Sequence, residues 1–221
     1  MRCLPCLLLL GCTTASIEDG AVTGPLTQVS DGFVSAFIAE TGDGSVLLVD
    51  ATNDPDSAVV VDALAERGYG PEDVVAVLMT HAHGDHTRGA RAFDAPLLGL
   101  EEDTALLAEE TDGAVSLDGT VRDGDTRTFG DLTVRVYSVP GHTPGSAVYL
   151  IDDVLVLGDV LVAKKDGAVG PPPSFFSEDP DQNDRSVRAL SDRLDAEGAE
   201  ISWMVFSHSA PLSGAGALRA F

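Results

Sequence analysis

A short polar segment rich in histidine constrains this chain more than any other feature. The segment His81-Ala82-His83-Gly84-Asp85-His86 follows an apolar, β-branched run at residues 74–79, which predicts a buried strand that ends in a loop. Three imidazoles and one carboxylate in six residues are poor core material, because each would need its own hydrogen-bond partner once buried. Metal ligation explains the pattern better, with a solvated, histidine-rich loop as the alternative.

The remaining histidines lie in similar places. The chain has 5 histidines, and the two outside the segment, His142 and His208, each follow another apolar run, at residues 132–139 and 203–206. No histidine is left over for an ordinary structural role. Taken singly, each of these two could still be a structural histidine, so their function as ligands is a hypothesis.

Four motifs resemble, in their order along the chain, the metal motifs of the metallo-β-lactamase fold. They are His81-x-His83-x-Asp85-His86, Pro140-Gly141-His142-Thr143-Pro144-Gly145-Ser146, Gly158-Asp159 and Ser207-His208. The resemblance spans about residues 33 to 210 and implies a single α/β domain, a four-layer αββα sandwich. The predicted order of strand, helix and strand before the first motif also suits an α/β sandwich.

The resemblance implies ligands for two metal ions. His81, His83 and His142 would hold the first ion and Asp85, His86 and His208 the second, with Asp159 bridging both. The expected cofactors are two Zn²⁺ ions, with iron or manganese as the alternative. All 3 cysteines precede residue 13, so imidazole and carboxylate must supply the ligands. Asp50 would either support this site from behind, as in the family, or serve as a turn or capping residue.

Such a site predicts a hydrolase. By this resemblance a hydroxide that bridges the two metals would attack a carbonyl carbon, and Asp85 would carry the proton afterwards. The bond could be an ester, thioester, lactone or amide of a small molecule. The alternatives are a mono-iron oxidoreductase that resembles the persulfide dioxygenases and a metal-binding lipoprotein without catalysis; serine rather than glycine before His208 keeps the latter open.

Departures from the family's usual features limit which branches of the family this sequence can resemble. Subclasses of β-lactamase with a cysteine ligand are excluded, and Asp159 favours the glyoxalase II-like, lactonase-like and phosphodiesterase-like members. Only residues 209–221 follow His208, so the helical region with which glyoxalase II binds glutathione is expected to be missing. The segment between Asp159 and His208 contains no tyrosine, so the catalytic tyrosine of quorum-quenching lactonases has no counterpart there.

The first residues predict export. One arginine, a short apolar core and a small residue before Cys12 match a secretory signal over residues 1–11. Leu9-Leu10-Gly11-Cys12 resembles the lipobox of bacterial lipoproteins, so Cys12 is the expected lipidation site. The expected location is then the cell envelope, with the protein facing the periplasm or the surface and the outer membrane favoured. A plain export signal or a misassigned start is the alternative. Residues 12–30 are then expected to be a tether and residues 31–221 the domain.

The charge bears on the partner. A net charge of −23 repels polyanions, so a small molecule is the expected substrate and nucleic acid is disfavoured. The membrane would be contacted only through the lipid anchor, and the oligomeric state is left open. Lys164 and Lys165 could attract a substrate carboxylate, and Phe175 and Phe176 could form an apolar wall. The alternative is a surface charge pair and a loop anchor.

The periodicity of apolar residues and the turn residues predict the other elements. Strands are expected at residues 33–39, 46–50, 97–100, 146–151, 154–157 and 201–206, and helices at 55–69, 87–93, 101–110 and 184–197. The first two strands flank Thr41-Gly42-Asp43-Gly44, a strong hairpin signal.

Overall fold

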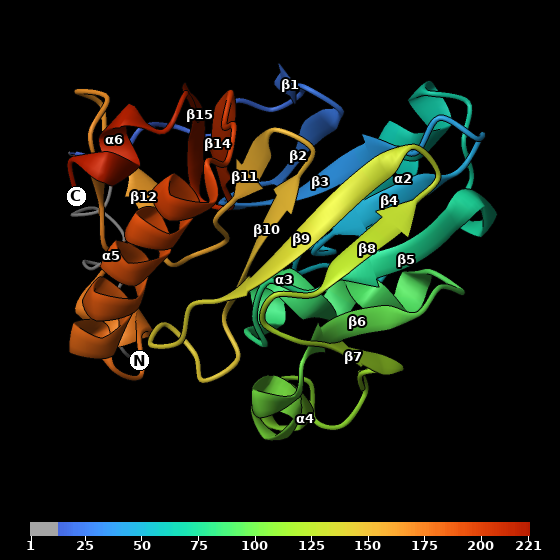
Figure 1. Cartoon of the computed structure of the whole chain (residues 1–221). Coiled ribbons are helices and arrows are strands. Elements are labelled where there is room, and N and C mark those ends of the chain that lie inside the picture. The colour runs from blue at the N-terminus through green and yellow to red at the C-terminus, as the bar shows by residue number, and fades with distance from the viewer. Residues whose placement is uncertain (1–12) are drawn as a thin grey trace.

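Two facing β-sheets form the centre of the protein, and helices cover the outer face of each (Figure 1). This computed structural model describes residues 13–221, so the predicted signal segment and Cys12 lie outside the described residues. The predicted four-layer αββα sandwich is confirmed.

The first sheet has seven strands that follow one another in chain order. They are β1 (Val22–Thr23), β2 (Leu26–Asp31), β3 (Val34–Glu40), β4 (Val46–Val49), β5 (Val74–Leu78), β6 (Leu97–Leu100) and β7 (Gly119–Val121). Strands β1 to β4 pair antiparallel, whereas β4 to β7 run parallel. Parallel neighbours require long crossovers, and these carry helices α2 (Ala58–Glu66), α3 (Gly84–Thr87) and α4 (Thr104–Glu110).

The second sheet has six strands in the order β15-β14-β11-β10-β9-β8. Their bounds are β8 (Thr126–Phe129), β9 (Leu132–Ser138), β10 (Ala147–Ile151), β11 (Val154–Val156), β14 (Trp203–Phe206) and β15 (Ser209–Ser213). Only β11 and β14 are parallel, and the chain between them contains a small hairpin, β12 (Val162–Ala163) with β13 (Val169–Gly170), and helix α5 (Pro180–Glu197). The last helix is α6 (Gly216–Arg219). Short 3₁₀ helices lie at Pro71–Asp73, Arg88–Ala92, Glu101–Asp103 and Ser174–Phe176.

Side-chain alternation along the strands creates three apolar layers. In β3, Phe37 and Ala39 face the core between the sheets, whereas Ala36 and Ile38 pack toward the layer that contains Val60 of α2. On the other side, one face of α5 covers the second sheet with Val187, Leu190 and Leu194. Both sheets are therefore buried on two faces, which explains why their central strands are nearly continuous apolar runs.

The domain begins earlier than expected. Residues 22–31, most of which were assigned to the tether, form β1 and β2 of the first sheet. Even the residues next to Cys12 are paired, because Thr13 O accepts from Lys165 N at 2.8 Å and Ala15 N donates to Ala163 O at 2.9 Å. The small, polar composition of this region hid these strands, which form because β1 pairs with β2 and β2 pairs with β3.

Helix positions also differ in detail from the prediction. Helix α5 begins at Pro180 rather than at residue 184, because Asp179 caps it by accepting from Gln182 N. The predicted helix at 87–93 is a 3₁₀ helix over 88–92 that continues α3, so Asp85 and His86 already lie within helical turns. Among the described residues, no helix combines the length and the apolar character needed to cross a membrane.

Candidate metal centre

All seven predicted ligands lie on segments that follow strands, and two of them, Asp85 and His86, lie in helix α3. The segment after β5 carries four of them, the loop between β9 and β10 carries His142, the segment after β11 carries Asp159, and the β14–β15 turn carries His208. The end of β5 is joined to the opposite sheet, since Tyr149 OH donates to Met79 O at 2.7 Å and Ala147 N donates to Thr80 O at 2.7 Å. The two sheets thus present the ligands at a shared edge.

The first histidine set is His81, His83 and His142. Its three ring nitrogens converge: His81 Nε2 lies 3.1 Å from His83 Nδ1, and His142 Nε2 lies 3.2 Å and 3.1 Å from these two atoms. Three nitrogens at about 2.0–2.1 Å from a tetrahedral Zn²⁺ would be about 3.3 Å apart. The observed spacing therefore fits one metal ion between three imidazoles.

The second ligand set is Asp85, His86 and His208. Asp85 Oδ2 lies 3.8 Å from His86 Nε2 and 3.6 Å from His208 Nε2. His86 Nε2 is buried and has no hydrogen-bond partner among the described residues. A buried imidazole nitrogen without a partner is costly, so a bound cation at this point is a good physical explanation.

Asp159 lies between the two sets. Its Oδ2 atom is 3.0 Å from His208 Nε2 and 3.7 Å from both His86 Nε2 and His142 Nε2. Its Oδ1 atom is buried and, within the described chain, has no hydrogen-bond partner. Asp159 thus lies between the two sets, and its role as a bridging ligand stays a prediction. Five imidazoles and two carboxylates without thiolate form a donor set that suits Zn²⁺.

Asp50 supports the site from behind rather than capping a helix. Its Oδ2 accepts from His86 Nδ1 at 2.9 Å and from Thr80 Oγ1 at 2.7 Å, and its Oδ1 accepts from Thr80 N at 2.8 Å. The residue has a positive φ of 58°, an uncommon conformation that aspartate tolerates. The contact to Nδ1 leaves Nε2 of His86 directed to the metal centre.

Asp103 is a supporting residue that the sequence analysis missed. It is fully buried, and its carboxylate accepts from Ala82 N at 2.8 Å, Thr143 Oγ1 at 2.7 Å and Gly145 N at 2.6 Å. These bonds join the loop of His81 and His83 to the loop of His142. Asp103 stands in the acidic run Glu101-Glu102-Asp103, which in the sequence resembles ordinary surface charge. Its position directly after the strand 97–100 was the only available signal.

Phe33 and Ser177 are two further contacts that the sequence did not reveal. His208 Nδ1 donates to Phe33 O at 2.5 Å, and the two rings are stacked with centroids 6.0 Å apart. His142 Nδ1 lies 3.2 Å from Ser177 Oγ. Both contacts use the nitrogen opposite the metal-facing one, so they orient the two rings.

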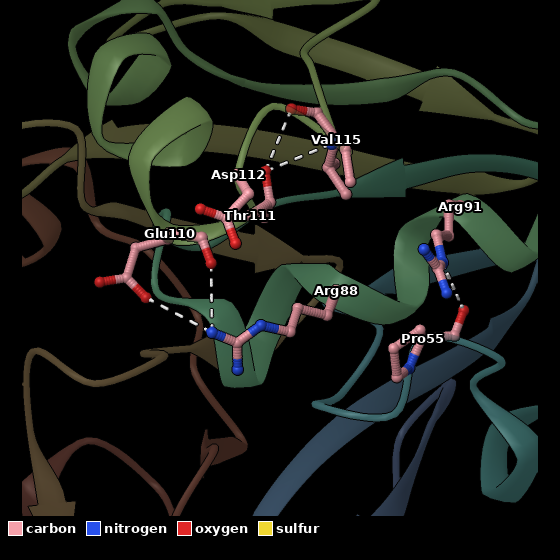
Figure 2. Close-up of a pocket in the computed structure, with 8 residues that line it drawn as sticks. Pro55, Arg88, Arg91, Glu110, Thr111, Asp112 and Val115 are labelled. Atoms are coloured by element: carbon pink, nitrogen blue, oxygen red, sulfur yellow. Dashed lines mark hydrogen bonds and ion pairs between the residues drawn. The ribbon is translucent and has the colours of Figure 1, made fainter.

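Arg88 connects the end of helix α3 to Asn53 and to helix α4. Its Nη1 donates to Asn53 Oδ1 at 2.8 Å and its Nη2 to Glu110 O at 3.1 Å, as Figure 2 shows for Glu110. The Glu110 carboxylate in turn accepts from Gly84 N at 3.2 Å. The small cleft beside Arg88 is lined by both signs of charge and includes none of the seven ligands. Its residues brace α3 against α4.

His81 and His142 differ in pKa from His86 and His208. Burial lowers the pKa of His81 well below its usual value and that of His142 to about 4. Burial opposes protonation of His86 and His208 as well, but their pKa values are raised. For His86, the charges of Asp159, Asp85 and Asp50 together outweigh burial. For His208, the charge of Asp159 and the hydrogen bonds to Asp159 and Phe33 do so. Burial would raise the pKa of Asp159, yet His208 and His86 hold it well below its usual value.

The residues predicted to bind substrate fall into two groups. Phe175 and Phe176 are exposed, contact each other with ring centroids 4.3 Å apart, and directly precede Ser177. Lys164 and Lys165 lie on the β12–β13 hairpin, where their backbone amides donate to Ala168 O and Thr13 O. Substrate binding by these four residues stays a prediction.

The fold and the site together define a class: an αββα metalloprotein whose histidine and aspartate ligands project from strand ends. Residues 29–208 match the family model described as the metallo-beta-lactamase superfamily. The match covers most of the chain, so the chain belongs to this superfamily.

Two curated relatives match about half of this chain in sequence. The chain is 37% identical over 93 residues to a hydroxyacylglutathione hydrolase of Shewanella sp. (strain ANA-3), a match to 40% of this chain and 35% of that protein. The corresponding enzyme of Brucella ovis is 34% identical over 122 residues, 52% of this chain and 44% of that one. The matches thus span less than half the length of these two relatives.

Solved structures match nearly the whole chain at low identity. A B3 metallo-β-lactamase with an active-site glutamic acid has a TM-score of 0.67 at 17% identity, covering 97% of this chain and 90% of that one. A subclass B3 enzyme of Bradyrhizobium japonicum has a TM-score of 0.62 at 24% identity, covering 88% and 79%. These matches show a shared fold.

Proposed function

We propose that the protein is a hydrolase that uses two metal ions, with zinc as the preferred metal. The observation that carries the proposal is the position of Asp159, whose Oδ2 lies within 3.0–3.7 Å of histidines from both ligand sets. A carboxylate between two ligand sets can bind to two metal ions at once, which supports a two-metal site. Zinc, when bound, would polarise the scissile carbonyl and lower the pKa of the attacking water towards about 7.

The protein's own groups then bind, orient and move protons. The Asp85 side chain is 25% exposed and lies beside both His86 and His208, so it faces the space in which a substrate would be hydrolysed. It can carry the proton that the attacking water releases and deliver it to the leaving group. Asp50 and Asp103 keep the ligand loops in place while this happens.

For the substrate, we propose a small molecule with an ester, thioester, lactone or amide bond and an apolar group beside it. Two exposed aromatic surfaces support an apolar group: Phe33, stacked on His208, and the pair Phe175 and Phe176, next to the Ser177 contact with His142. The names of the relatives favour a thioester first, because hydroxyacylglutathione hydrolases cleave the acyl group from glutathione. A net charge of −23 disfavours nucleic acid.

For the location, we propose the bacterial cell envelope, with Cys12 as the lipidated first residue. The support is the sequence Leu9-Leu10-Gly11-Cys12 after a short apolar core. Mass spectrometry of the membrane-fraction protein should find a lipid on Cys12, and Cys12→Ser should move the protein out of the membrane fraction. An unmodified Cys12 in a membrane-free protein would contradict this proposal.

The test of the hydrolase is metal content followed by a substrate panel. Protein without its leader should contain about two zinc ions per chain and should hydrolyse at least one of an ester, a thioester, a lactone and a β-lactam. A chelator should abolish the turnover and added zinc should restore it. One iron per chain would instead support the oxidoreductase, and bound metal without any turnover would support the non-catalytic metal-binding lipoprotein.

A further inference from the structure

Gln28 is a buried amide on β2 that contacts the turn carrying His208. Its side chain is almost inaccessible, and Nε2 lies 3.3 Å from Phe206 O, 3.1 Å from Ser209 O and 2.9 Å from Ser35 Oγ. These three acceptors share the two Nε2 hydrogens. Gln28 and Phe206 are 178 residues apart in the chain, so only the folded protein brings them together.

The turn is as short as a hairpin turn can be. Strand β14 ends at Phe206 and β15 begins at Ser209, and these two residues pair with each other, so only Ser207 and His208 lie between them. Gln28 binds the carbonyls of both flanking residues and so bridges the base of the turn. Ser35, on the neighbouring strand β3, also holds the turn itself, because its backbone N donates to Ser207 O at 2.8 Å.

The β2–β3 hairpin also sets the ring of His208. The carbonyl of Phe33, at the tip of this hairpin, accepts from His208 Nδ1, which leaves Nε2 free to face Asp159 Oδ2 at 3.0 Å. Backbone and ring of this ligand are therefore both held by one element. Its first strand, β2, lies mostly within residues 12–30, the segment predicted to be a tether.

Packing alone gives no reason for an amide at position 28. Gln28 Oε1 and Ser207 Oγ are both buried without a hydrogen-bond partner in the described part of the chain. Such atoms cost free energy, which an apolar side chain of similar length would avoid. The three bonds of Nε2 are what the glutamine contributes in return.

We propose that Gln28 is a positioning residue for the second metal: it holds the β14–β15 turn so that His208 can complete the second ligand set. This inference rests on the proposed two-metal centre. Gln28 should affect the second metal site alone, because none of its described hydrogen bonds reaches the first histidine set.

The test is metal titration of Gln28→Leu beside the unchanged protein. Stepwise addition of Co²⁺ to metal-free protein, followed by the visible spectrum, reports the two sites separately without any substrate. We expect the affinity for the second ion to fall about 10- to 100-fold while the first binds as before. Thr27→Val, on the neighbouring and oppositely directed position of β2, is the matched control and should leave both steps unchanged.

Folding and function are separated by two further measurements. Thermal melting checks that Gln28→Leu is folded; if it is not, Gln28→Met, which keeps length and flexibility, takes its place. Equal affinities for both ions in a folded variant, or an equal loss at both sites, would overturn the role of Gln28. If the unchanged protein binds only one ion, the two-metal proposal itself fails, and this outcome is visible before any variant is compared.

Discussion

The two halves of the metal centre are built differently. The first histidine set is held by Asp103, whose carboxylate is buried and accepts three hydrogen bonds, and two of its members, His81 and His142, are almost fully buried. In the second set, Asp85 and His208 are 25% and 24% exposed. His208 is held by the β2–β3 hairpin, and at this contact Gln28 Oε1 and Ser207 Oγ are buried without partners in the described residues.

This difference indicates that the first histidine set is preorganised for a metal ion and that the second set is less so. The three nitrogens of the first set converge, and burial lowers the pKa of His81 and His142, so protons compete weakly with a metal for these two rings. The second set is more open, and its histidines are paired with carboxylates. We therefore expect the first metal to bind tightly and the second to bind more weakly, and the following changes test that expectation.

The largest effect is expected for Asp85→Asn. The amide cannot carry a proton, so kcat should fall about 100- to 10,000-fold, while the first metal stays bound. Steady-state kinetics with the best substrate of the panel, together with metal analysis and a thermal melt, measure this. Asp94→Asn, an exposed acid in the same crossover between β5 and β6, is the control. Full activity of Asp85→Asn would refute the role of Asp85.

Asp103→Asn should weaken the first metal site rather than the second. An amide cannot accept from Ala82 N, Thr143 Oγ1 and Gly145 N together, so the hydrogen bonds that connect the two loops of the first histidine set are no longer all made. The affinity for the first metal should drop about 10- to 100-fold, the opposite selectivity to Gln28→Leu. Glu102→Gln, the exposed neighbour, should behave like the unchanged protein. A larger loss at the second metal would contradict this assignment.

Acid should remove the second metal before the first. The raised pKa values of His86 and His208 mean that these rings hold protons to higher pH, so a metal must displace them. His142, with a pKa of about 4, is already neutral at pH 6. Each displaced proton makes the affinity fall about tenfold per pH unit as the pH decreases. Metal analysis after dialysis at stepped pH from about 7.5 to 5.5 would show loss of both ions together if this view is wrong.

Phe33→Ala should have the smallest effect and should sharpen the role of the hairpin tip. The ring is 57% exposed, so stability should change by less than about 0.5 kcal/mol. The bond to His208 uses the backbone carbonyl and should survive, so metal affinity should not change. KM for substrates with a bulky apolar group should rise about 10-fold relative to acetyl analogues, in keeping with about 1–2 kcal/mol of lost apolar contact. An equal rise in KM for the bulky substrates and for the acetyl analogues would show that Phe33 does not select the substrate.

Much of the chain could be predicted from short-range patterns. The strands that feed the metal loops are apolar, β-branched runs with polar residues directly after them, and the hairpin at Thr41-Gly42-Asp43-Gly44 has its own turn chemistry. Helix α5 follows from the apolar spacing of Val187, Leu190 and Leu194. Such elements are encoded within about ten residues, which is why their positions were nearly right.

Strands and contacts that depend on distant partners could not be predicted in the same way. Strand β2 has a mixed sequence and becomes a strand by pairing with β3 along its whole length. Asp103 and Gln28 are an acid in an acidic run and an amide in a polar stretch, and neither residue type is unusual there. Their importance lies in acceptors and donors that approach from other parts of the chain.

By itself, the sequence determined the kind of chemistry: histidines and aspartates, each placed at the end of an apolar run, could only be gathered where strands end. The tertiary structure decided how they are gathered, with three imidazole nitrogens within 3.2 Å of one another and Asp159 between the two sets. It also decided which residues hold them. The physical reason is range: side-chain periodicity is a local property of the chain, whereas a hydrogen bond across 178 residues exists only after two sheets have packed.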